Sequence, residues 1–290
     1  FDGITGKLIK SGGALATSVR SVALTGLSLA TSAVIAATDT VLQAFGKLQA
    51  QITDNLLPAG YIDGLQMVWV SGTALTVTSG AAYIPGSSKV LRATSDIAKT
   101  GLSLSASTWY HVYLYDNSGT PDVEIVATAP AAAYNGTARS KTGDASRRYV
   151  GSALTNSSGA LLNFLHNTQS GFVTHLVTTA NAPFRIVSNG QASGARNVST
   201  AGVSPVTALQ IYVRLVNLIS APAGDTLFVS NPDYTPTVSA SAYIISIAGS
   251  GGEHFVFHPV STSQLINYFL PGTATSGGVY MDVFGYTYVR

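Results

Sequence analysis

Two acidic side chains near the middle of the chain are the first candidates for chemistry. Asp122 and Glu124 are separated by one residue, so on a β-strand their side chains share one face. Glycoside hydrolysis needs two carboxylates about 5–10 Å apart. The chain has only 13 acidic residues, and most of them stand beside Gly, Pro, Asn or Ser. A solvated strand face explains the pair better than catalysis, and we expect no catalytic residue and no enzyme activity.

Histidines are the next candidates, as metal ligands. His254 and His258 bracket the tripeptide FVF, and on a helix this spacing could chelate zinc. The segment is expected to be a strand, where positions four apart are separated by roughly 13 Å. Two such side chains cannot share one ion, although each could meet a symmetry-related copy. His111 is expected to be a hydrogen-bonded sheet residue. The chain contains no cysteine, so we expect no metal site and no cofactor.

A basic segment spans residues 139–148. It carries Arg139, Lys141, Arg147 and Arg148, with Asp144 among them. One interpretation is a site for phosphate or an acidic glycan. The other is a loop whose charges are solvated or paired with a sister subunit.

Aromatic residues in the C-terminal part suggest a binding surface. Rigid aromatic side chains on loops contribute contact area at low entropic cost, and they stack on sugars or enter protein grooves. Tyr234 stands between two prolines, and Tyr243, Tyr268, Phe269 and Tyr280 lie in the same C-terminal half. The alternative is that most of these rings are buried in a core or between subunits. The candidate binding residues are Asn231, Asp233, Tyr234, Tyr268 and Tyr280.

Composition narrows the class of protein. Of the 290 residues, 46% are hydrophobic and only 10% are charged, against about a quarter charged in ordinary globular proteins. Such a surface is hidden against sister subunits or must tolerate harsh extracellular conditions. The net charge of +2 gives no reason to expect nucleic-acid or anionic-membrane binding.

One helix is predicted, over Thr38–Leu57. Its apolar residues alternate at spacings of three and four, which is the seam of a coiled coil. Asp39 is the predicted N-cap, and Pro58 ends the pattern. A helix of about five turns is marginal alone in water, so a second copy of the chain is its expected partner. The seam residues are Val34, Val41, Phe45, Leu48 and Ile52, and their β-branched members favour three strands.

The segment before the helix shows no sustained period. Residues 1–33 contain five glycines and cannot bury a core alone, so we expect an extended stem. Ser21–Thr38 is an uncharged run of 18 residues. Six of these are Ser or Thr, which favours burial between subunits over membrane insertion. The chain has no initiator Met, so we expect it to begin within a longer protein or after processing.

After Pro58 the pattern becomes β. Residues 109–115 and 122–127 predict a hairpin closed at Asp116–Gly119, and further short strands follow at regular spacing. The last predicted strand, 279–289, alternates: Tyr280, Asp282, Phe284, Tyr286 and Tyr288 on one face, Val279, Met281, Val283 and Val289 on the other. Other strands are predicted at 65–70, 74–78, 81–85, 89–92, 149–154, 161–165, 207–219, 225–230, 241–248, 254–258 and 264–269.

The expected fold is therefore mainly β. It comprises an extended N-terminal stem (1–33), a short trimeric coiled-coil helix (34–57), a β domain (58–170) and a C-terminal β-sandwich tip (171–290).

Several segments resemble tail fibres and receptor-binding proteins of tailed bacteriophages. They are FDGITGKLIKSGG, TDTVLQAFGKLQAQI, GSSKVLRATSDIAKTGLSLSASTWYHVYLYDNSGTPDVEIV and GTARSKTGDASRRYVGS, all within residues 1–165. The resemblance implies a homotrimeric virion protein, assembled in the host cytoplasm and carried on the tail. Its N-terminal side would join other tail or baseplate proteins, and its tip would bind a host-surface glycan or protein. A purely structural baseplate, collar or capsid-fibre protein and a glycan depolymerase remain the alternatives.

Overall fold

The computed structural model describes residues 26–28, 33–54, 57–220, 226–249 and 251–290. The chain divides into two compact units, residues 1–57 and 58–290, and each is described by itself. Most of the predicted stem, residues 1–25 and 29–32, lies outside the described residues.

The N-terminal unit contains helix α2, Val41–Asp54. The predicted helix is confirmed, but it begins at Val41 rather than at Thr38; residues 55–56 of the predicted range lie outside the described residues. The predicted N-cap was wrong by one residue. Thr40 caps the helix, because its Oγ1 accepts the Gln43 N–H at 3.2 Å and the Gln43 Oε1 accepts the Thr40 N–H at 2.8 Å. This reciprocal pair is a capping box. No helix among the described residues is long and apolar enough to span a bilayer.

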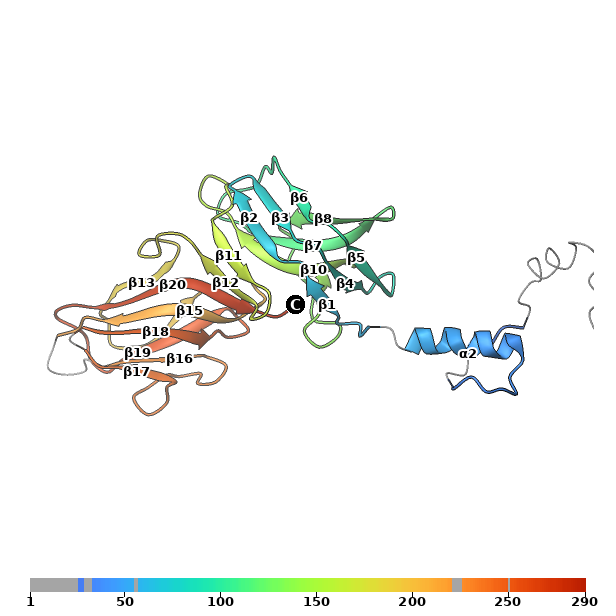
Figure 1. Cartoon of the computed structure of the whole chain (residues 1–290). Helices are drawn as coiled ribbons and strands as arrows, with labels where there is room; N and C mark the ends of the chain where they lie inside the picture. The colour runs from blue at the N-terminus through green and yellow to red at the C-terminus, as the bar shows by residue number, and fades with distance from the viewer. Residues whose placement is uncertain (1–25, 29–32, 55–56, 221–225, 250) are drawn as a thin grey trace, which may run out of the picture. The chain divides into compact units, whose positions relative to one another are not determined.

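Three antiparallel sheets are built from residues 62–154 of the second unit (Figure 1). The first has the order β1-β4-β5 (Ile62–Gly64, Gly80–Ile84, Lys89–Ala93). The second has the order β2-β3-β6 (Met67–Ser71, Ala74–Val77, Ile97–Lys99). The third has the order β8-β7-β10-β9 (Thr120–Val126, Trp109–Asn117, Asp144–Leu154, Ser140–Lys141).

The predicted hairpin is confirmed as β7 and β8, with Asn117 opposite Thr120. Ser118 and Gly119 form the two-residue turn, with φ of 53° and 91°. Positive φ at both positions is the conformation of a type I′ turn, whose twist matches the twist of the flanking strands. The sequence Asn-Ser-Gly-Thr therefore fixes the register of the hairpin.

The remaining strands form a six-stranded and a four-stranded sheet. The larger has the order β11-β12-β20-β15-β18, with β13 also paired to β20. Its strands are Phe164–Asn167, Phe172–His175, Val279–Tyr288, Ala208–Asn217, Gly252–Pro259 and Arg185–Gly190. The smaller is β14-β19-β16-β17 (Gly194–Ser199, Leu265–Leu270, Leu227–Ser230, Ile245–Ile247). Figure 1 shows β15, β18 and β20 in one layer and β16, β17 and β19 in the next. The mainly β class is thus confirmed, and this pair of sheets is consistent with a β-sandwich.

Strand β20 departs from its predicted alternation. Val283 lies opposite Val213 and Gly285 opposite Tyr212, so one extra residue, Phe284, is inserted in β20. This β-bulge reverses the alternation. Val279, Met281 and Val283 are buried before it, and Tyr286 and Tyr288 after it. The prediction that Tyr286 and Tyr288 lie on the face opposite Val279, Met281 and Val283 was wrong, because the bulge turns both rings into the core.

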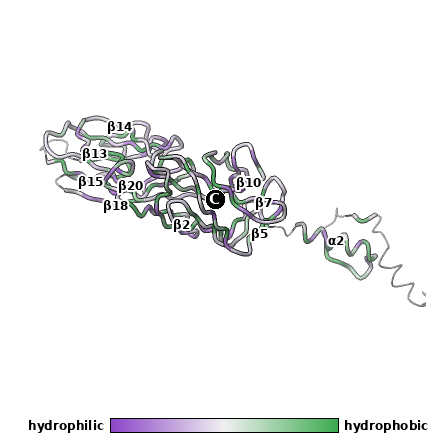
Figure 2. The backbone as a smooth tube through the Cα atoms, turned by 90° about the horizontal axis from the view of Figure 1, so that it is seen from above, coloured by the Kyte–Doolittle hydropathy of each residue, from purple (hydrophilic) through white to green (hydrophobic). Residues whose placement is uncertain are grey.

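One continuous hydrophobic core joins both halves of residues 58–290. Strands β1–β10 and strands β11–β20 belong to separate sheets. The C-terminal strand nevertheless reaches the first half: Tyr286 Oη donates to the Ser152 carbonyl at 2.8 Å, and Arg290 donates to the Leu65 and Gly64 carbonyls at 3.0 and 2.9 Å. Short hydrophobic and hydrophilic stretches alternate along the chain (Figure 2), as expected where strands have one face in a core.

Candidate functional site

The predicted seam forms an uncovered apolar stripe along α2. Val41, Phe45, Leu48 and Ile52 are 74%, 52%, 43% and 54% exposed, and Val34, just before the helix, is 86% exposed. Successive turns of a helix carry residues three and four apart on one side, so the four helical residues form a single row. Exposed apolar residues in such a row are rare on a monomer and mark a contact surface.

The opposite side of α2 is covered by the chain itself. Gly46 and Ala50 are buried, and a Cβ on Gly46 would collide with the Ser28 carbonyl oxygen. Residues 26–28 therefore run against the face that the seam does not use. The chain's own covering segment leaves the seam open.

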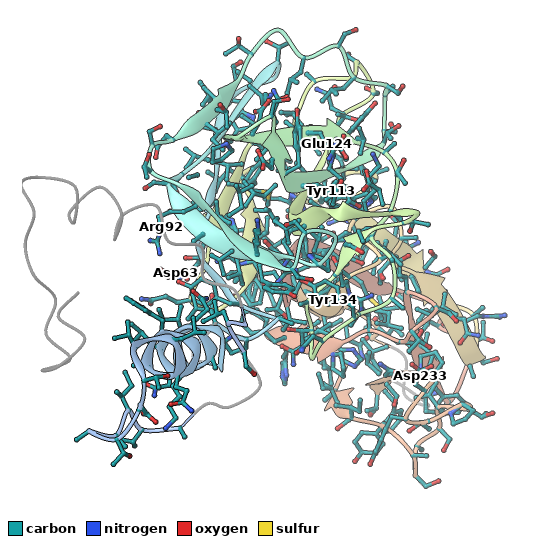
Figure 3. All side chains as sticks on the ribbon, turned by 90° about the vertical axis from the view of Figure 1, so that its right-hand side faces the viewer. Asp63, Arg92, Tyr113, Glu124, Tyr134 and Asp233 are labelled. Atoms are coloured by element: carbon teal, nitrogen blue, oxygen red, sulfur yellow. The ribbon has the colours of Figure 1, made fainter. Side chains whose placement is uncertain are left out.

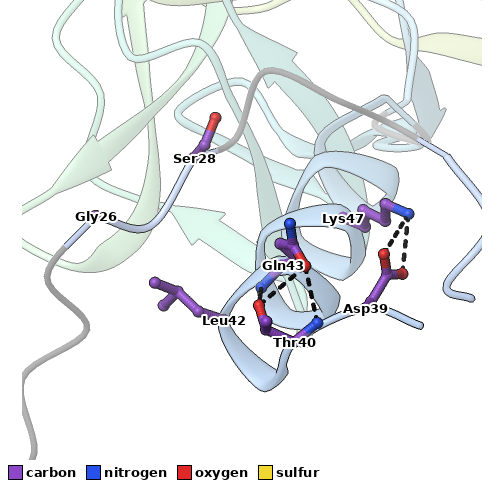
Figure 4. A pocket seen from close by; sticks show the side chains of 7 residues that line it. All are labelled: Gly26, Ser28, Asp39, Thr40, Leu42, Gln43 and Lys47. Carbon is purple, nitrogen blue, oxygen red and sulfur yellow. Dashed lines mark hydrogen bonds and ion pairs between the residues drawn. The ribbon is translucent and has the colours of Figure 1, made fainter. Parts of the chain in front are cut away.

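A hollow of about 540 Å³ lies beside the helix N-terminus, lined by Gly26, Ser28, Asp39, Thr40, Leu42, Gln43 and Lys47 (Figure 4). Its polar groups bind one another. Besides the capping box, the Asp39 carboxylate forms an ion pair with the Lys47 ammonium at 2.9 Å. It also accepts a hydrogen bond from the Ala36 N–H at 2.7 Å. Lys47, and then Ala36, hold the pKa of Asp39 below its ordinary value. The polar side chains that line the hollow are therefore explained by their contacts with one another, which stabilise the start of the helix.

The predicted carboxylate pair is neutralised within the chain. Asp122 is paired with Lys99 at 2.7 Å. Burial alone would raise the pKa of Asp122, but the Lys99 ammonium and the Val123 N–H outweigh it, so the net pKa is lowered. Glu124 is paired with Lys141 at 2.7 Å and Arg147 at 3.3 Å. General acid catalysis by one carboxyl group of a pair needs a raised pKa, and Asp122 has the opposite shift.

The basic segment is a strand pair rather than a loop, because it forms β9 and the start of β10. Arg148 is fully buried and donates to the carbonyl oxygens of Arg139 and Gly60 at 3.1 and 3.2 Å. Arg139 donates to the Ala131 carbonyl at 2.9 Å, and Arg147 lies 3.9 Å from the centre of the Tyr115 ring. These cations have partners in their own chain, so neither predicted interpretation, an anion site or a pair with a sister subunit, is needed to explain them.

The histidines are separated and mostly buried. His258 is buried in β18 and contacts the Pro259 carbonyl through Nδ1 at 2.8 Å, whereas His254 is exposed. His111 lies 2.7 Å from Ser152 Oγ through Nδ1, as expected for a hydrogen-bonded sheet residue, and burial lowers its pKa to about 4. Within the described ranges, no three His, Asp or Glu side chains gather as metal ligands.

The five candidate binding residues do not form one cluster. Asn231, Asp233 and Tyr234 lie on the loop between β16 and β17, whereas Tyr268 is in β19 and only 7% exposed. Tyr280 in β20 is half-buried, with Arg185 at 5.0 Å from its ring centre. Figure 3 shows Asp233 on a loop of the second half, well apart from Glu124 in the first. Of the three tyrosines among them, Tyr234 is the most exposed, at 74%.

Tyr234 lines an open groove of about 490 Å³ on this loop. Tyr243, 41% exposed, lines the same groove. The other lining residues are Thr235, Pro236, Thr237, Ser241 and Ala242. The sequence indicated the aromatic residues, but only the fold brings the two rings to one groove.

A second aromatic surface covers the outer face of the six-stranded sheet. Five rings pack with neighbouring centres 4.9–6.3 Å apart: Phe172, Tyr212, Phe255, Phe257 and Phe284. Phe255 and Phe257 are 51% and 48% exposed. We call these five residues the aromatic face. Sequence reasoning missed it because the rings come from four strands whose adjacency is a property of the sheet order. The spacing of Phe255 and Phe257, two residues apart, was the one feature of the sequence that could have indicated this face, because such residues share one side of a strand.

A row of charges crosses four strands beside the aromatic face. Asp282, only 1% exposed, accepts hydrogen bonds from Arg185 at 2.7 and 3.0 Å and from Arg214 at 3.2 Å. Arg214 also binds Glu253 at 2.6 and 3.2 Å. Two cations and two anions alternate, so the row is neutral overall. A partner on this face meets aromatic rings and compensated charges.

Comparison with known proteins adds no relative: no family model matches the chain, and no curated protein shows significant sequence similarity to it.

Proposed function

We propose that the chain is a homotrimeric tail fibre or receptor-binding protein that attaches a phage to its host. The observation that carries the proposal is the seam of α2. Four apolar side chains stand exposed in one row, and the chain's own covering segment lies on the other side of the helix. A helix of 14 residues with such a row gains its stability from packing against another apolar row, and three copies can supply it.

The β unit supports the proposal in two ways. Its aromatic face offers a further uncovered apolar surface for contact between copies, with the aromatic and arginine content typical of interface centres. Its loops also carry the exposed tyrosines of the groove, which are suited to contact with a host surface. The N-terminal side would then join other tail proteins, and the assembly would be part of the virion.

The assembly is tested with Phe45→Asp. Three carboxylates would meet in an apolar seam, where unpaired buried charges are strongly destabilising, so we expect the variant to be monomeric by mass measurement in native buffer. Gln49→Glu, one turn along the helix and outside the seam, should remain trimeric. A wild-type monomer, or a trimer of Phe45→Asp, would exclude this seam as the assembly contact.

Attachment is tested by adding the purified chain to host bacteria before the phage. The trimer should block adsorption, and Phe45→Asp should block it far more weakly, because three linked sites multiply weak individual contacts. An assembled trimer that leaves adsorption unchanged would favour a purely structural virion protein.

A further inference from the structure

The groove at Tyr234 and Tyr243 is held open by its own loop, which begins with a side-chain turn. Asn231 is buried, and its Oδ1 accepts the Asp233 N–H at 2.7 Å. The Asn231 carbonyl accepts the N–H groups of Tyr234 and Thr235 at 3.0 and 2.8 Å. The Thr235 carbonyl in turn accepts a hydrogen bond from the buried Asn267 Nδ2 at 2.9 Å. The first half of the loop is thereby fixed to β19.

The second half of the loop is fixed as well. Ser239 and Ala242 form an isolated β-bridge, with backbone hydrogen bonds of 3.0 and 3.2 Å. The Tyr243 ring packs 4.9 Å from the Phe228 ring, which lies 6.2 Å from Phe269. Tyr243 is therefore supported from the sheet while 41% of its surface stays open. A preformed site of this kind loses little conformational entropy on binding.

The lining of the groove is uncharged. Its seven residues are two tyrosines, two threonines, a serine, a proline and an alanine. The nearest charged residue along the loop is Asp233, and its Oδ2 accepts the Thr262 N–H at 2.7 Å. An ionic ligand would find no opposite charge in this groove to replace the water it loses.

The same lining suits a ligand with both an apolar face and hydroxyl groups. The tyrosine rings offer flat apolar surface with a polar tip. Thr237 and Ser241, both exposed, add hydroxyls that can donate and accept hydrogen bonds. A neutral pyranose ring has C–H groups on its faces and hydroxyls on its rim. A fully apolar ligand would leave the groove hydroxyls without partners, and an acidic sugar would lose hydration without compensation.

We infer that this groove binds a neutral glycan, with Tyr234 and Tyr243 as stacking residues and the exposed Thr237 and Ser241 as hydrogen-bonding residues. The inference rests on the proposed attachment function and names the receptor chemistry that such a fibre would recognise.

The test applies the assembled 290-residue chain to a glycan array that holds neutral, acidic and sulfated oligosaccharides. Binding should be confined to neutral glycans and change less than about twofold between about 50 mM and 500 mM salt, because no charge pair is involved. Tyr234→Ala and Tyr243→Ala should each weaken it about tenfold or more, as expected for exposed aromatic anchors. Tyr234→Phe should retain most of the stacking. Leu165→Ala, which truncates a 61% exposed apolar side chain on β11, away from the groove, the seam and the aromatic face, serves as the control.

Three results would overturn the inference: binding only to acidic or sulfated glycans, no binding to any glycan, or unchanged binding by both alanine variants. Adsorption to host cells separates this failure from failure of the proposed function. A chain that still blocks phage adsorption with both tyrosines replaced keeps the attachment function and loses the groove. If treating the host cells with protease abolishes adsorption and treating them with periodate does not, the receptor is a protein rather than a glycan. A chain that never affects adsorption fails at the proposed function itself.

Discussion

The Nε2 atom of His166 lies 3.0 Å from the Tyr288 hydroxyl, joining strand β11 to the last strand of the chain. His166 Nδ1 accepts the Met67 N–H at 3.0 Å, which places the proton on Nε2, so the ring donates to Tyr288. Tyr288 in turn donates to the Val150 carbonyl at 2.8 Å. One buried chain of hydrogen bonds therefore crosses both halves of the β unit.

Tyr288→Phe should lower the free energy of unfolding of the β unit. The change keeps the ring but leaves the His166 Nε2–H and the Val150 carbonyl buried without their partner, at a cost of about 1–3 kcal/mol for each group. Urea titration followed by circular dichroism measures it. Tyr234→Phe, which alters a hydroxyl on a 74% exposed side chain, should leave the midpoint unchanged. Equal midpoints for the two variants would show that the hydrogen-bond chain contributes little.

Acid should destabilise the β unit between about pH 6.5 and pH 4. Burial lowers the pKa of His111, His175 and His258 to about 4 and, with a smaller contribution from Arg290, that of His166 to about 3. Above pH 6.5 these side chains are neutral in both states. As the pH falls below the unfolded value, the unfolded chain binds protons that the folded chain does not, so stability is lost.

The slope of the free energy of unfolding against pH depends on how many histidines take up protons only in the unfolded chain. Each contributes about 1.4 kcal/mol per pH unit within the window. Four buried histidines should therefore give a steep fall, measured as the free energy of unfolding at several pH values. A flat profile from pH 7 to pH 4.5 would mean that these side chains are protonated in the folded protein.

Asp282→Asn should be strongly destabilising. The carboxylate is buried between Arg185 and Arg214, and removing its charge leaves two guanidinium groups without their shared partner. Breaking a buried ion network from one side costs about 3–5 kcal/mol. Glu253→Gln, at the solvent-exposed end of the same row, should have little effect. Comparable losses for the two variants, measured by thermal unfolding, would contradict the assignment of Asp282 as the buried centre.

Gly285→Ala should disturb the bulge in β20. A Cβ at Gly285 would collide with the Val173 carbonyl oxygen on the neighbouring strand, so β12 and β20 must separate or shift. We expect a loss of about 1–3 kcal/mol, measured by urea titration. Gly202→Ala is the control, because the nearest atom to a Cβ there is 3.9 Å away. If Gly285→Ala is as stable as Gly202→Ala, the strands do not pack this closely at the bulge.

Local patterns determined much of the secondary structure. The hairpin of β7 and β8 follows from β-branched and aromatic residues on both sides of a Ser-Gly turn, and α2 follows from the seam spacing. Both depend on interactions between residues close in sequence. The short strands β1, β6, β9, β12, β13 and β14 escaped prediction, because segments such as GARNVS and RIVSNG have little apolar periodicity. Pairing with neighbouring strands decides their conformation.

The sequence by itself also determined the open seam, since Val41, Phe45, Leu48 and Ile52 repeat along a single helix. Only the tertiary structure decided which residues far apart in the sequence contact one another. The bulge at Phe284 turned Tyr286 and Tyr288 inward, and the sheet order gathered the aromatic face. Lys141 and Arg147 of the basic segment form ion pairs with Glu124 of the same chain. Tyr234 and Tyr243 share a groove because the loop folds back. Each of these depends on contacts between residues distant in sequence, which no local spacing encodes.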